Sequence, residues 1–246
     1  MYKKISIIIP IYNEFENVKK IINNLKDVED IYEVIFSDGS NDYKSKREII
    51  EANKKYNSNI FKYIESSKGR AVQMNTGYKY SCGDIILFLH CDSIVENDLS
   101  LKIISSINEN KVEFGCLSLY FDDKRLLMKI CGYMSRKRAE RRKIAFGDQG
   151  MFFRKETFEL IGMFPEIALM EDYEASIRAK KYTNLKQINS KIITSSRKYY
   201  SNKGIFNKGK LSFIGILKTM LDMQIFQYQY RRGVSPDKLL EKYYKK

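Results

Sequence analysis

Asp92 is placed where a carboxylate can do chemistry, because it closely follows five apolar residues, 85–89, that are typical of a buried strand. A carboxylate at the end of such a strand can bind a hard divalent cation, which in turn can bridge phosphate oxygens. Asp92 can instead cap a turn with Ser93. His90, the single histidine of the chain, is a candidate ligand or proton carrier, or else a packed side chain. The spacing alone leaves these alternatives open.

A second acidic group, Glu171 and Asp172, opens a segment with a helical pattern. Carboxylates at a helix N-terminus complement the helix dipole, and for the neighbouring Glu174 we prefer that explanation. Two adjacent carboxylates that follow an irregular loop can also present a general base to a ligand crevice. The spacing does not decide between these two roles for Glu171 and Asp172.

Further polar residues stand near predicted turns. Arg70 lies at the predicted start of a helix, where a cation beside the helix N-terminus suits the binding of an anion. The alternative is an ordinary helix start that faces solvent. Gln149 belongs to a polar turn, 147–150, which is either an ordinary turn or a contact for an acceptor. The chain contains neither the glycine-rich dinucleotide fingerprint nor the P-loop motif, so those two classes of nucleotide site lose their main support.

The segments that must position these residues alternate between strand and helix patterns. This rhythm indicates a parallel, doubly wound α/β sheet with helices on both faces. In an open parallel sheet the ligand crevice lies at the carboxyl ends of the strands. Asn13 is expected to cap the first helix, with Glu16 at the capping-box position. The expected strands are 4–9, 31–36, 60–64 and 84–89, and the expected helices are 13–25, 43–56 and 69–80.

The second half of the chain is less regular. We divide the chain into a domain of catalytic size, residues 1–205, and a C-terminal helical extension, residues 206–246. The basic run at 135–143 is expected to be a solvated helix face, with a grip on phosphate or anionic lipid as the alternative. The patterns predict strands at 112–120 and 150–153, helices at 124–143 and 171–180, and two helices beyond residue 204.

The composition predicts a folded protein with a strong positive charge. The chain has 246 residues, 43% of them apolar, and a formal net charge of +14. A charge of this size suits nucleic acid, an anionic membrane or a polyphosphate ligand. No run is long and apolar enough to span a bilayer, and we see no secretory signal, so the expected location is cytoplasmic.

Much of the positive charge lies in the last fifth of the chain, since residues 197–246 include 12 basic side chains and only 3 acidic ones. An apolar stripe in this region is expected to pack on the catalytic domain. The alternative is peripheral contact with an anionic membrane, at the inner face of the cell membrane, which a lipid-linked acceptor would suit. The members of the stripe are Leu211, Ile214, Leu217, Leu221 and Ile225.

Six short motifs, taken in order, resemble those of family 2 glycosyltransferases with the GT-A fold. They extend over most of residues 4–200, and their common order and separations are more specific than any one of them. The turn and the histidine-containing motif are similar in particular to a bacterial subgroup, the radical-SAM/selenodomain-associated transferase 2 proteins. The motifs are IIPIYNE at 8–14, SDGSND at 37–42, GRAVQMNTG at 69–77, FLHCDS at 88–93, GDQG at 147–150 and MEDYE at 170–174.

The resemblance implies a doubly wound, Rossmann-like domain with a mostly parallel sheet, and an inverting transfer of sugar from a nucleoside-diphosphate sugar. The expected donor is a UDP-sugar or a GDP-sugar, and the acceptor is a hydroxyl group of an unknown molecule. Asp172 would be the base, oriented by Glu171, and Asp92 would hold Mg²⁺ or Mn²⁺ on the diphosphate. The nucleotide sugar would contact Pro10, Tyr12, Glu14, Asp38, Arg70, Asp92 and Gln149.

Two positions depart from the family pattern. The usual Asp-x-Asp is His90-Cys91-Asp92 in this chain, so one carboxylate toward the ribose or the metal is missing. The usual pair of aspartates in the second motif is Ser37-Asp38, and only Asp38 carries the family role. We therefore expect metal affinity or donor choice to differ from the family pattern.

Two other functions compete with sugar transfer. Nucleotidyl transfer on the same fold also needs a metal and a phosphate site. A basic module that binds nucleic acid or a membrane surface would explain the charge, but the C-terminal aromatics recur at helical intervals that suit a core or lipid better than base stacking. We therefore expect a glycosyltransferase with no nucleic-acid partner.

Overall fold

The computed structural model describes residues 2–196 and 213–244, and its centre is an eight-stranded sheet in the order β3-β2-β1-β4-β7-β6-β8-β5. β1 to β4 run parallel, and β6 is parallel to β8. The strands are β1 (Ile5–Ile11), β2 (Ile31–Asp38), β3 (Phe61–Glu65), β4 (Ile85–Phe88), β5 (Ile94–Val95), β6 (Phe114–Phe121), β7 (Met151–Arg154) and β8 (Lys186–Thr194).

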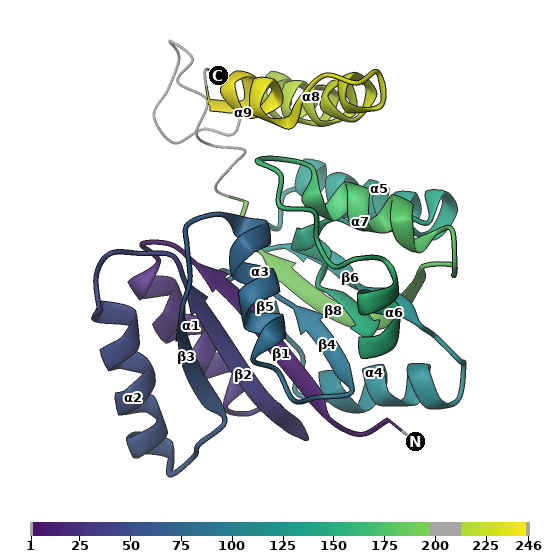
Figure 1. Ribbon diagram of the computed structural model, residues 1–246. Helices are drawn as coiled ribbons and strands as arrows, with labels where there is room; N and C mark the ends of the chain where they lie inside the picture. The colour runs from purple at the N-terminus through teal and green to yellow at the C-terminus, as the bar shows by residue number, and fades with distance from the viewer. Residues whose placement is uncertain (1, 197–212, 245–246) are drawn as a thin grey trace.

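Helices cover both faces of this sheet (Figure 1). α1, α2 and α4 pack on one face, whereas α3, α6 and α7 pack on the other. The helices are α1 (Phe15–Leu25), α2 (Lys44–Tyr56), α3 (Arg70–Lys79), α4 (Leu99–Asn108), α5 (Leu126–Arg142), α6 (Lys155–Leu160), α7 (Glu171–Ala179), α8 (Phe213–Arg231) and α9 (Pro236–Tyr244), with a 3₁₀ turn, η1, at Gly147–Gln149.

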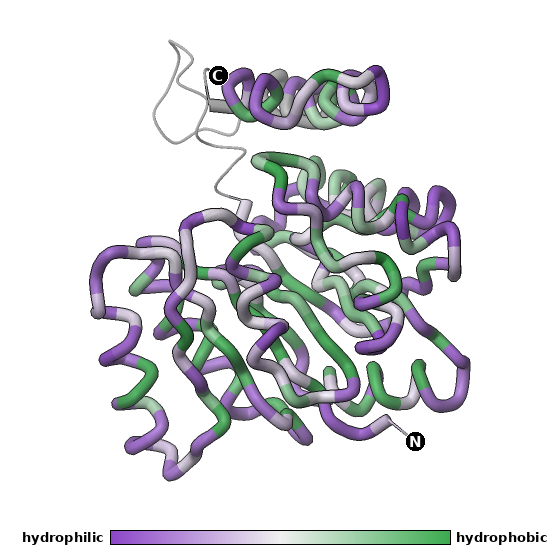
Figure 2. The backbone as a smooth tube through the Cα atoms, in the orientation of Figure 1, coloured by the Kyte–Doolittle hydropathy of each residue, from purple (hydrophilic) through white to green (hydrophobic). Residues whose placement is uncertain are grey.

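The buried strands explain why both faces need a cover. Successive side chains of a strand point to opposite faces, so a run of apolar residues is buried only between two layers. In β1, Ile7 and Ile9 belong to the core beneath α1, while Ile8 belongs to the core beneath α3. The hydrophobic colour is accordingly continuous along the central strands (Figure 2). The doubly wound α/β architecture predicted from the sequence is confirmed.

One strand reverses the direction of the sheet. β7 lies between β4 and β6 and runs antiparallel to both. The patterns located β7 but did not predict its direction, and they missed α4 and β8. In β8, buried and exposed side chains alternate along Lys186–Thr194. Its mixture of lysine, asparagine and isoleucine hides this strand from a search for continuous apolar runs.

The predicted cap of the first helix was wrong. α1 begins at Phe15, Glu14 occupies the cap position, and no side-chain hydrogen bond caps this helix. Asn13 has φ 55°, a left-handed conformation that asparagine tolerates but a side-chain cap does not use. Its N–H donates to Ser40 Oγ at 2.7 Å, so the turn after β1 is bent toward the turn after β2.

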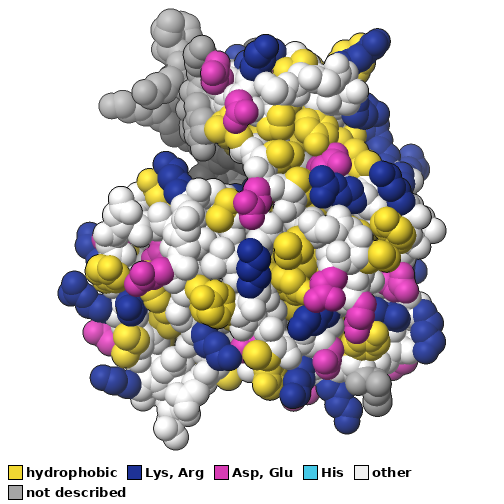
Figure 3. Space-filling model, viewed as in Figure 1, with side chains coloured by type: hydrophobic (Ala, Val, Ile, Leu, Met, Phe, Trp, Pro, Cys, Tyr) yellow, Lys and Arg dark blue, Asp and Glu magenta, His cyan; other side chains and the backbone are white. Residues whose placement is uncertain are grey.

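The C-terminal helices dock on the body through an apolar cluster. Phe226 and Leu239 pack with Phe146, Met170 and Tyr173. Figure 3 shows apolar side chains gathered along the seam between these helices and the body. The extension therefore packs on the sheet-containing part of the chain, while the proposed boundary near residue 205 lies outside the described residues.

The face of α8 that docks is not the stripe expected from the sequence. Leu221 and Ile225 are 62% and 47% exposed, whereas Phe226 and Gln227 are buried. Leu211 lies outside the described residues, and Leu221 and Ile225 are the stripe members whose side chains are described. For these two members the expectation of packing was wrong, because α8 is apolar on more than one side and the sequence does not say which side meets the body. No helix within 2–196 or 213–244 is long and apolar enough to cross a membrane.

The buried carboxylate of Glu33, near the start of β2, connects this strand to β1, to β3 and to the turn before β4. Glu33 accepts hydrogen bonds from Ser6 Oγ at 2.5 Å and from the Cys82 N–H at 2.6 Å, and it pairs with Lys62 Nζ at 2.6 Å. Burial by itself raises the pKa of a carboxyl group, but these three donors together hold the pKa of Glu33 below its usual value of 4.5.

We expect Glu33→Gln to lower the free energy of unfolding by about 2 kcal/mol at neutral pH, because charge-assisted hydrogen bonds are lost in a buried site. Since folding lowers the pKa of Glu33, its contribution is complete above about pH 4.5 and disappears as the pH falls through the lowered value. Urea unfolding at several pH values measures the difference. Glu51→Gln, at an exposed position of α2, is the control, and an equal loss in both variants would contradict the prediction.

Candidate active site

The candidate site lies at the carboxyl edge of β4. Met151 pairs with Phe88, so the antiparallel β7 begins where β4 ends. η1, the turn that precedes β7, is thereby brought over the end of β4 beside His90. The reversed strand thus places the turn 147–149 at the edge where an open parallel sheet is expected to have its ligand crevice.

Asp172 is anchored by three hydrogen bonds. Its Oδ2 accepts hydrogen bonds from the Gly147 N–H at 2.8 Å and from Arg70 Nη2 at 3.0 Å. Its Oδ1 accepts from the Tyr173 N–H at 2.7 Å. A carboxylate offers about four lone-pair positions, so these donors fix its orientation and leave capacity for one further donor.

Arg70 joins both acids at the start of α7. Its Nε donates to Glu171 Oε1 while its Nη2 donates to Asp172. Glu171 is almost fully buried, and burial raises its pKa, although the positive charge of Arg70 opposes the rise. The Arg70 side chain as a whole is partly exposed, so the residue that orients the acids also borders the space open to an anionic ligand.

His90 and Asp172 face the same space beside Gly147. A methyl group added at Gly147 would lie 2.7 Å from His90 Nε2 and 3.4 Å from Asp172 Oδ2. The absence of a side chain at residue 147 therefore keeps these two groups accessible to each other and to a ligand. The sequence located this turn as a motif but did not show that Gly147 itself supplies an N–H to Asp172.

The imidazole of His90 is neutral at physiological pH. Burial and the nearby charge of Arg70 lower its pKa to about 4, although Asp148, Asp92 and Asp172 oppose the shift. Asp92 follows His90 by two residues after the end of β4, and Asp172, like the same imidazole, lies beside Gly147. The structure thus brings the two acids, which are 80 positions apart in the sequence, to the same edge of the sheet.

A metal ion could be held here by one carboxylate together with a ligand. Within residues 2–196 and 213–244, no three His, Cys, Asp or Glu side chains converge to hold an ion unaided. Asp92 offers a carboxylate, and the buried His90 Nε2 accepts no hydrogen bond from the described part of the chain. Mg²⁺ is commonly held by one or two carboxylates with substrate phosphates completing its shell, and this donor set fits that arrangement.

The ends of β1 and β2 form a second part of the crevice. Asp38 is buried, and its Oδ1 accepts from the Ser40 N–H at 2.8 Å. Burial and the charge of Asp38 raise the pKa of Tyr63, whose ring stands beside this carboxylate. Gln73 of α3 donates to the Ile11 and Ser37 carbonyls and thereby ties the two strand ends together.

The turn after β1 presents an aromatic ring to solvent. Tyr12 is exposed, and Lys68 Nζ lies 4.4 Å from the centre of its ring. Glu14 turns toward α1, where its carboxylate accepts from Asn17 Nδ2 at 2.8 Å. Pro10 is half-buried and pairs in register with Ser37 of β2.

The family model of glycosyl transferase family 2 matches residues 6–162, which is more than half of the chain. The chain belongs to this family. The match includes Asp38, Arg70, Asp92 and η1, and it ends before α7. Among the activities left open by the sequence, family membership favours glycosyl transfer over nucleotidyl transfer.

Curated relatives of this family 2 glycosyltransferase match only a part of their own length. The poly-beta-1,6-N-acetyl-D-glucosamine synthases of Staphylococcus aureus (strain COL) and Staphylococcus epidermidis are each 28% identical to it, over 110 and 108 residues. Each match covers 43% of this chain and 26% of the relative. The chain thus matches about a quarter of the length of these relatives.

Solved glycosyltransferase structures share the fold. Staphylococcus aureus TarS 1–349 in complex with UDP-GlcNAc has a TM-score of 0.61 and 15% identity, over 85% of this chain and 60% of that one. The mannosyltransferase PcManGT from Pyrobaculum calidifontis, in complex with GDP-Man and Mn²⁺, has a TM-score of 0.66 and 17% identity, over 96% and 68%. These likenesses confirm the predicted GT-A fold.

Gln149 lies beneath the crevice of this glycosyltransferase. Its side chain is fully buried, and its Oε1 accepts from Arg138 Nη2 at 3.1 Å and from the Phe146 N–H at 3.2 Å. These bonds hold η1 against α5. Gln149 thus supports the turn that carries Gly147, and its contact with the nucleotide sugar stays a prediction.

Sequence reasoning also missed the residues that support α7 from outside the crevice. Tyr230 of α8 donates to Glu174 Oε2 at 3.0 Å, and its ring meets Tyr173 edge-on. Tyr173 stacks on Phe146 with 6.0 Å between the ring centres. The aromatic character of these positions was visible in the sequence, but their partners lie too far along the chain for any local pattern to connect them.

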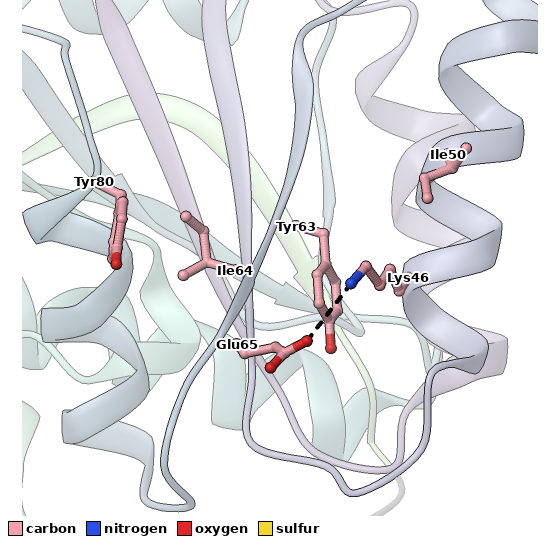
Figure 4. A pocket seen from close by; sticks show the side chains of 6 residues that line it. All are labelled: Lys46, Ile50, Tyr63, Ile64, Glu65 and Tyr80. Carbon is pink, nitrogen blue, oxygen red and sulfur yellow. Dashed lines mark ion pairs between the residues drawn. The ribbon is translucent and has the colours of Figure 1, made fainter.

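A shallow pocket at the edge of the sheet lies apart from Asp172, although Tyr63, which stands beside Asp38, is one of its lining residues. Residues of β3 and of the first half of α2 line this pocket, and a 3.6 Å ion pair between Lys46 and Glu65 crosses it (Figure 4). Its walls, which include the exposed Ile50 and Tyr80, contain none of the residues that contact Asp172. We therefore place the chemistry at the end of β4.

Gly147→Ala is expected to lower the turnover of this glycosyltransferase about tenfold to a hundredfold, because the added methyl group must displace His90 or Asp172 from the positions they now hold. Steady-state kinetics with a sugar donor and thermal unfolding measure the effect. Gly132→Ala on α5 is the control, because a methyl group there would meet its nearest neighbours, Arg136 Nη1, the Leu119 carbonyl and the Phe121 ring, at 3.2 Å or more. Equal turnover in both variants would show that the space beside Gly147 is not used.

Proposed function

We propose that this protein is an inverting, metal-dependent glycosyltransferase in which Asp172 deprotonates the acceptor hydroxyl. The observation that supports this most strongly is the fixed Asp172 carboxylate, which shares its crevice with His90 and Asp92 at the end of β4. A base must lie within hydrogen-bond reach of the attacking oxygen, and its lone pair must point there before the reaction. Three N–H donors supply that orientation in the free protein.

The reaction is a single displacement. The acceptor oxygen attacks the anomeric carbon while its proton passes to Asp172, and the bond from that carbon to the diphosphate breaks. The nucleoside diphosphate leaves with the bonding electron pair. Because attack and departure lie on opposite faces of the sugar, the anomeric configuration inverts. Glu171, held by Arg70, orients the base or the acceptor.

Mg²⁺ or Mn²⁺ would be held by Asp92 in the donor complex. Such an ion would neutralise the charge that develops on the departing diphosphate. Two features support this assignment: Asp92 lies in the crevice, and the structurally similar mannosyltransferase PcManGT was solved with GDP-Man and Mn²⁺. His90, which replaces the first acid of the usual motif, contributes a neutral imidazole there in place of a second negative charge.

The nucleotide of the donor would lie against the ends of β1 and β2. Tyr12 offers an exposed ring, Asp38 a buried carboxylate for the base, and Arg70 a partly exposed cation for the phosphates. Pro10 and Glu14 border the same turn. A UDP-sugar or a GDP-sugar is the proposed donor, since the similar structures contain UDP-GlcNAc and GDP-Man.

Four further assignments are part of this proposal. The motifs support membership of the radical-SAM/selenodomain-associated transferase 2 subgroup. The change of pattern beyond residue 204 supports a division into domains 1–205 and 206–246. An acceptor linked to lipid, and a cytoplasmic protein in peripheral contact with the inner face of the cell membrane, complete the proposal. The exposed Leu221 and Ile225 on α8 support that contact.

Asp172→Asn is expected to lower sugar transfer about 10² to 10⁴-fold while donor binding persists, because the amide keeps the shape of the carboxylate but does not accept the acceptor proton. The acceptor is unidentified, so hydrolysis of UDP-GlcNAc and GDP-Man, with water as acceptor, supplies the assay. Asp98→Asn is the matched control, since Asp98 is an exposed carboxylate that likewise stands at the start of a helix. Full activity of the Asp172 variant would refute its role as the base.

A donor should raise the melting temperature only when a divalent cation is present, because a ligand that binds the native state alone stabilises it. We expect one of UDP-GlcNAc and GDP-Man to do so in the presence of Mn²⁺. Asp92→Asn should abolish this shift, whereas Asp98→Asn should preserve it. A donor-dependent shift of equal size without Mn²⁺, or in the Asp92 variant, would show that Asp92 does not hold an ion on the diphosphate.

A further inference from the structure

Helix α5 exposes a row of large apolar side chains. Leu126, Ile130, Tyr133 and Met134 are 74%, 43%, 53% and 50% exposed. Their spacing of three and four residues places them on one side of the helix. The buried side of α5 is also apolar, since Met128 and Cys131 form a cluster against the end of β6. The helix thus has one apolar side that packs on the protein and a second that meets solvent.

The segment that carries this exposed row is strongly basic. Residues 124–143 contain nine basic side chains and one acidic one. The single acid, Glu140, pairs with Lys137 at 2.8 Å, and the Asp123 that precedes the segment pairs with Arg125. Lys124 and Lys129 are exposed on either side of Leu126. An apolar row with a cationic border is unusual for a surface that meets only water.

The charge selects among the possible occupants of this face. A second copy of the chain would bring together two surfaces of the same sign on a protein with a net charge of +14, which opposes association. An anionic bilayer offers acyl chains to the apolar row and negative headgroups to its cationic border. Tyrosine, here Tyr133, is itself favoured at the boundary between headgroups and acyl chains.

We propose that α5 lies flat on an anionic membrane surface, with Leu126, Ile130, Tyr133 and Met134 inserted at the headgroup boundary. This assigns a surface to the proposed peripheral contact that differs from the stripe on α8. It does not depend on sugar transfer, because lipid binding is measured without any donor.

The same helix connects this surface to the candidate active site. Arg138 of α5 donates to Gln149 of η1, and its guanidinium lies 4.4 Å from the centre of the Phe146 ring. Gly147, whose N–H donates to Asp172, lies between Phe146 and Gln149 in the sequence. A membrane contact through α5 therefore lies one helix away from the acidic crevice, where an acceptor carried by the same membrane would arrive.

The test is flotation of the full chain with vesicles of phosphatidylglycerol and phosphatidylcholine in equal parts, compared with vesicles of phosphatidylcholine alone. We expect binding to the anionic vesicles that weakens as salt is added. Leu126→Ser combined with Ile130→Ser, and separately Lys124→Glu combined with Lys129→Glu, should each weaken binding about tenfold or more. Circular dichroism and the melting temperature verify that these variants are folded.

Two control variants make the result specific to α5. Leu160→Ser combined with Tyr182→Ser removes apolar side chains of similar exposure elsewhere on the body, and should bind like the unmodified protein. Leu221→Ser combined with Ile225→Ser tests the stripe on α8. Loss of binding in this variant, with full binding in both α5 variants, would overturn the proposal in favour of α8.

Two other outcomes overturn the proposal. Failure of the unmodified protein to float with anionic vesicles does so directly. If light scattering shows a dimer that Leu126→Ser combined with Ile130→Ser converts to a monomer, and vesicles are not bound, the face is an interface between two copies. Loss of sugar transfer in Asp172→Asn with unchanged flotation would leave both proposals intact and separate.

Discussion

The hydrogen bonds that the Asp172 carboxylate accepts from Gly147 and Arg70 are the contacts on which the crevice depends. A charged carboxylate removed from water is costly unless donors replace its hydration, so the segments that carry those donors must stay in place. Arg70 starts α3, Gly147 belongs to the turn before β7, and Asp172 starts α7. One buried charge thus aligns three elements, and Glu171 is held by the same guanidinium.

The reversed strand makes this arrangement possible. Were β7 parallel to β4, the turn that precedes it would open at the far edge of the sheet. Because β7 runs antiparallel, Met151 pairs with Phe88 and η1 stands over the end of β4. The parallel half of the sheet, which offers Asp38 and Asp92, then shares one edge with residues from the second half. The proposed donor site and the proposed base come from these two halves.

The C-terminal helices support the same region from outside. Phe226 and Tyr230 pack beside Tyr173, which directly follows Asp172, and the Tyr230 hydroxyl donates to Glu174. Burial and this bond raise the pKa of Tyr230 to about 12, so its hydroxyl remains a donor at physiological pH. α8 is thereby part of the support of α7. Leu221 and Ile225 of α8, like the exposed apolar row of α5, lie on the surface of the described part of the chain.

The sequence by itself determined the local elements and the chemistry that they carry. Continuous apolar runs identified β1 and β4 as strands buried on both faces, and the motifs around Asp92 and Asp172 identified the acids. This was possible because the apolar runs of a buried strand and the short motifs around the acids are patterns of neighbouring residues. Only the tertiary structure decided the direction of β7, the docking face of α8 and the pairing of Arg70 with Glu171. Those partners lie 101 residues apart, and no local pattern records which distant segment a side chain will meet.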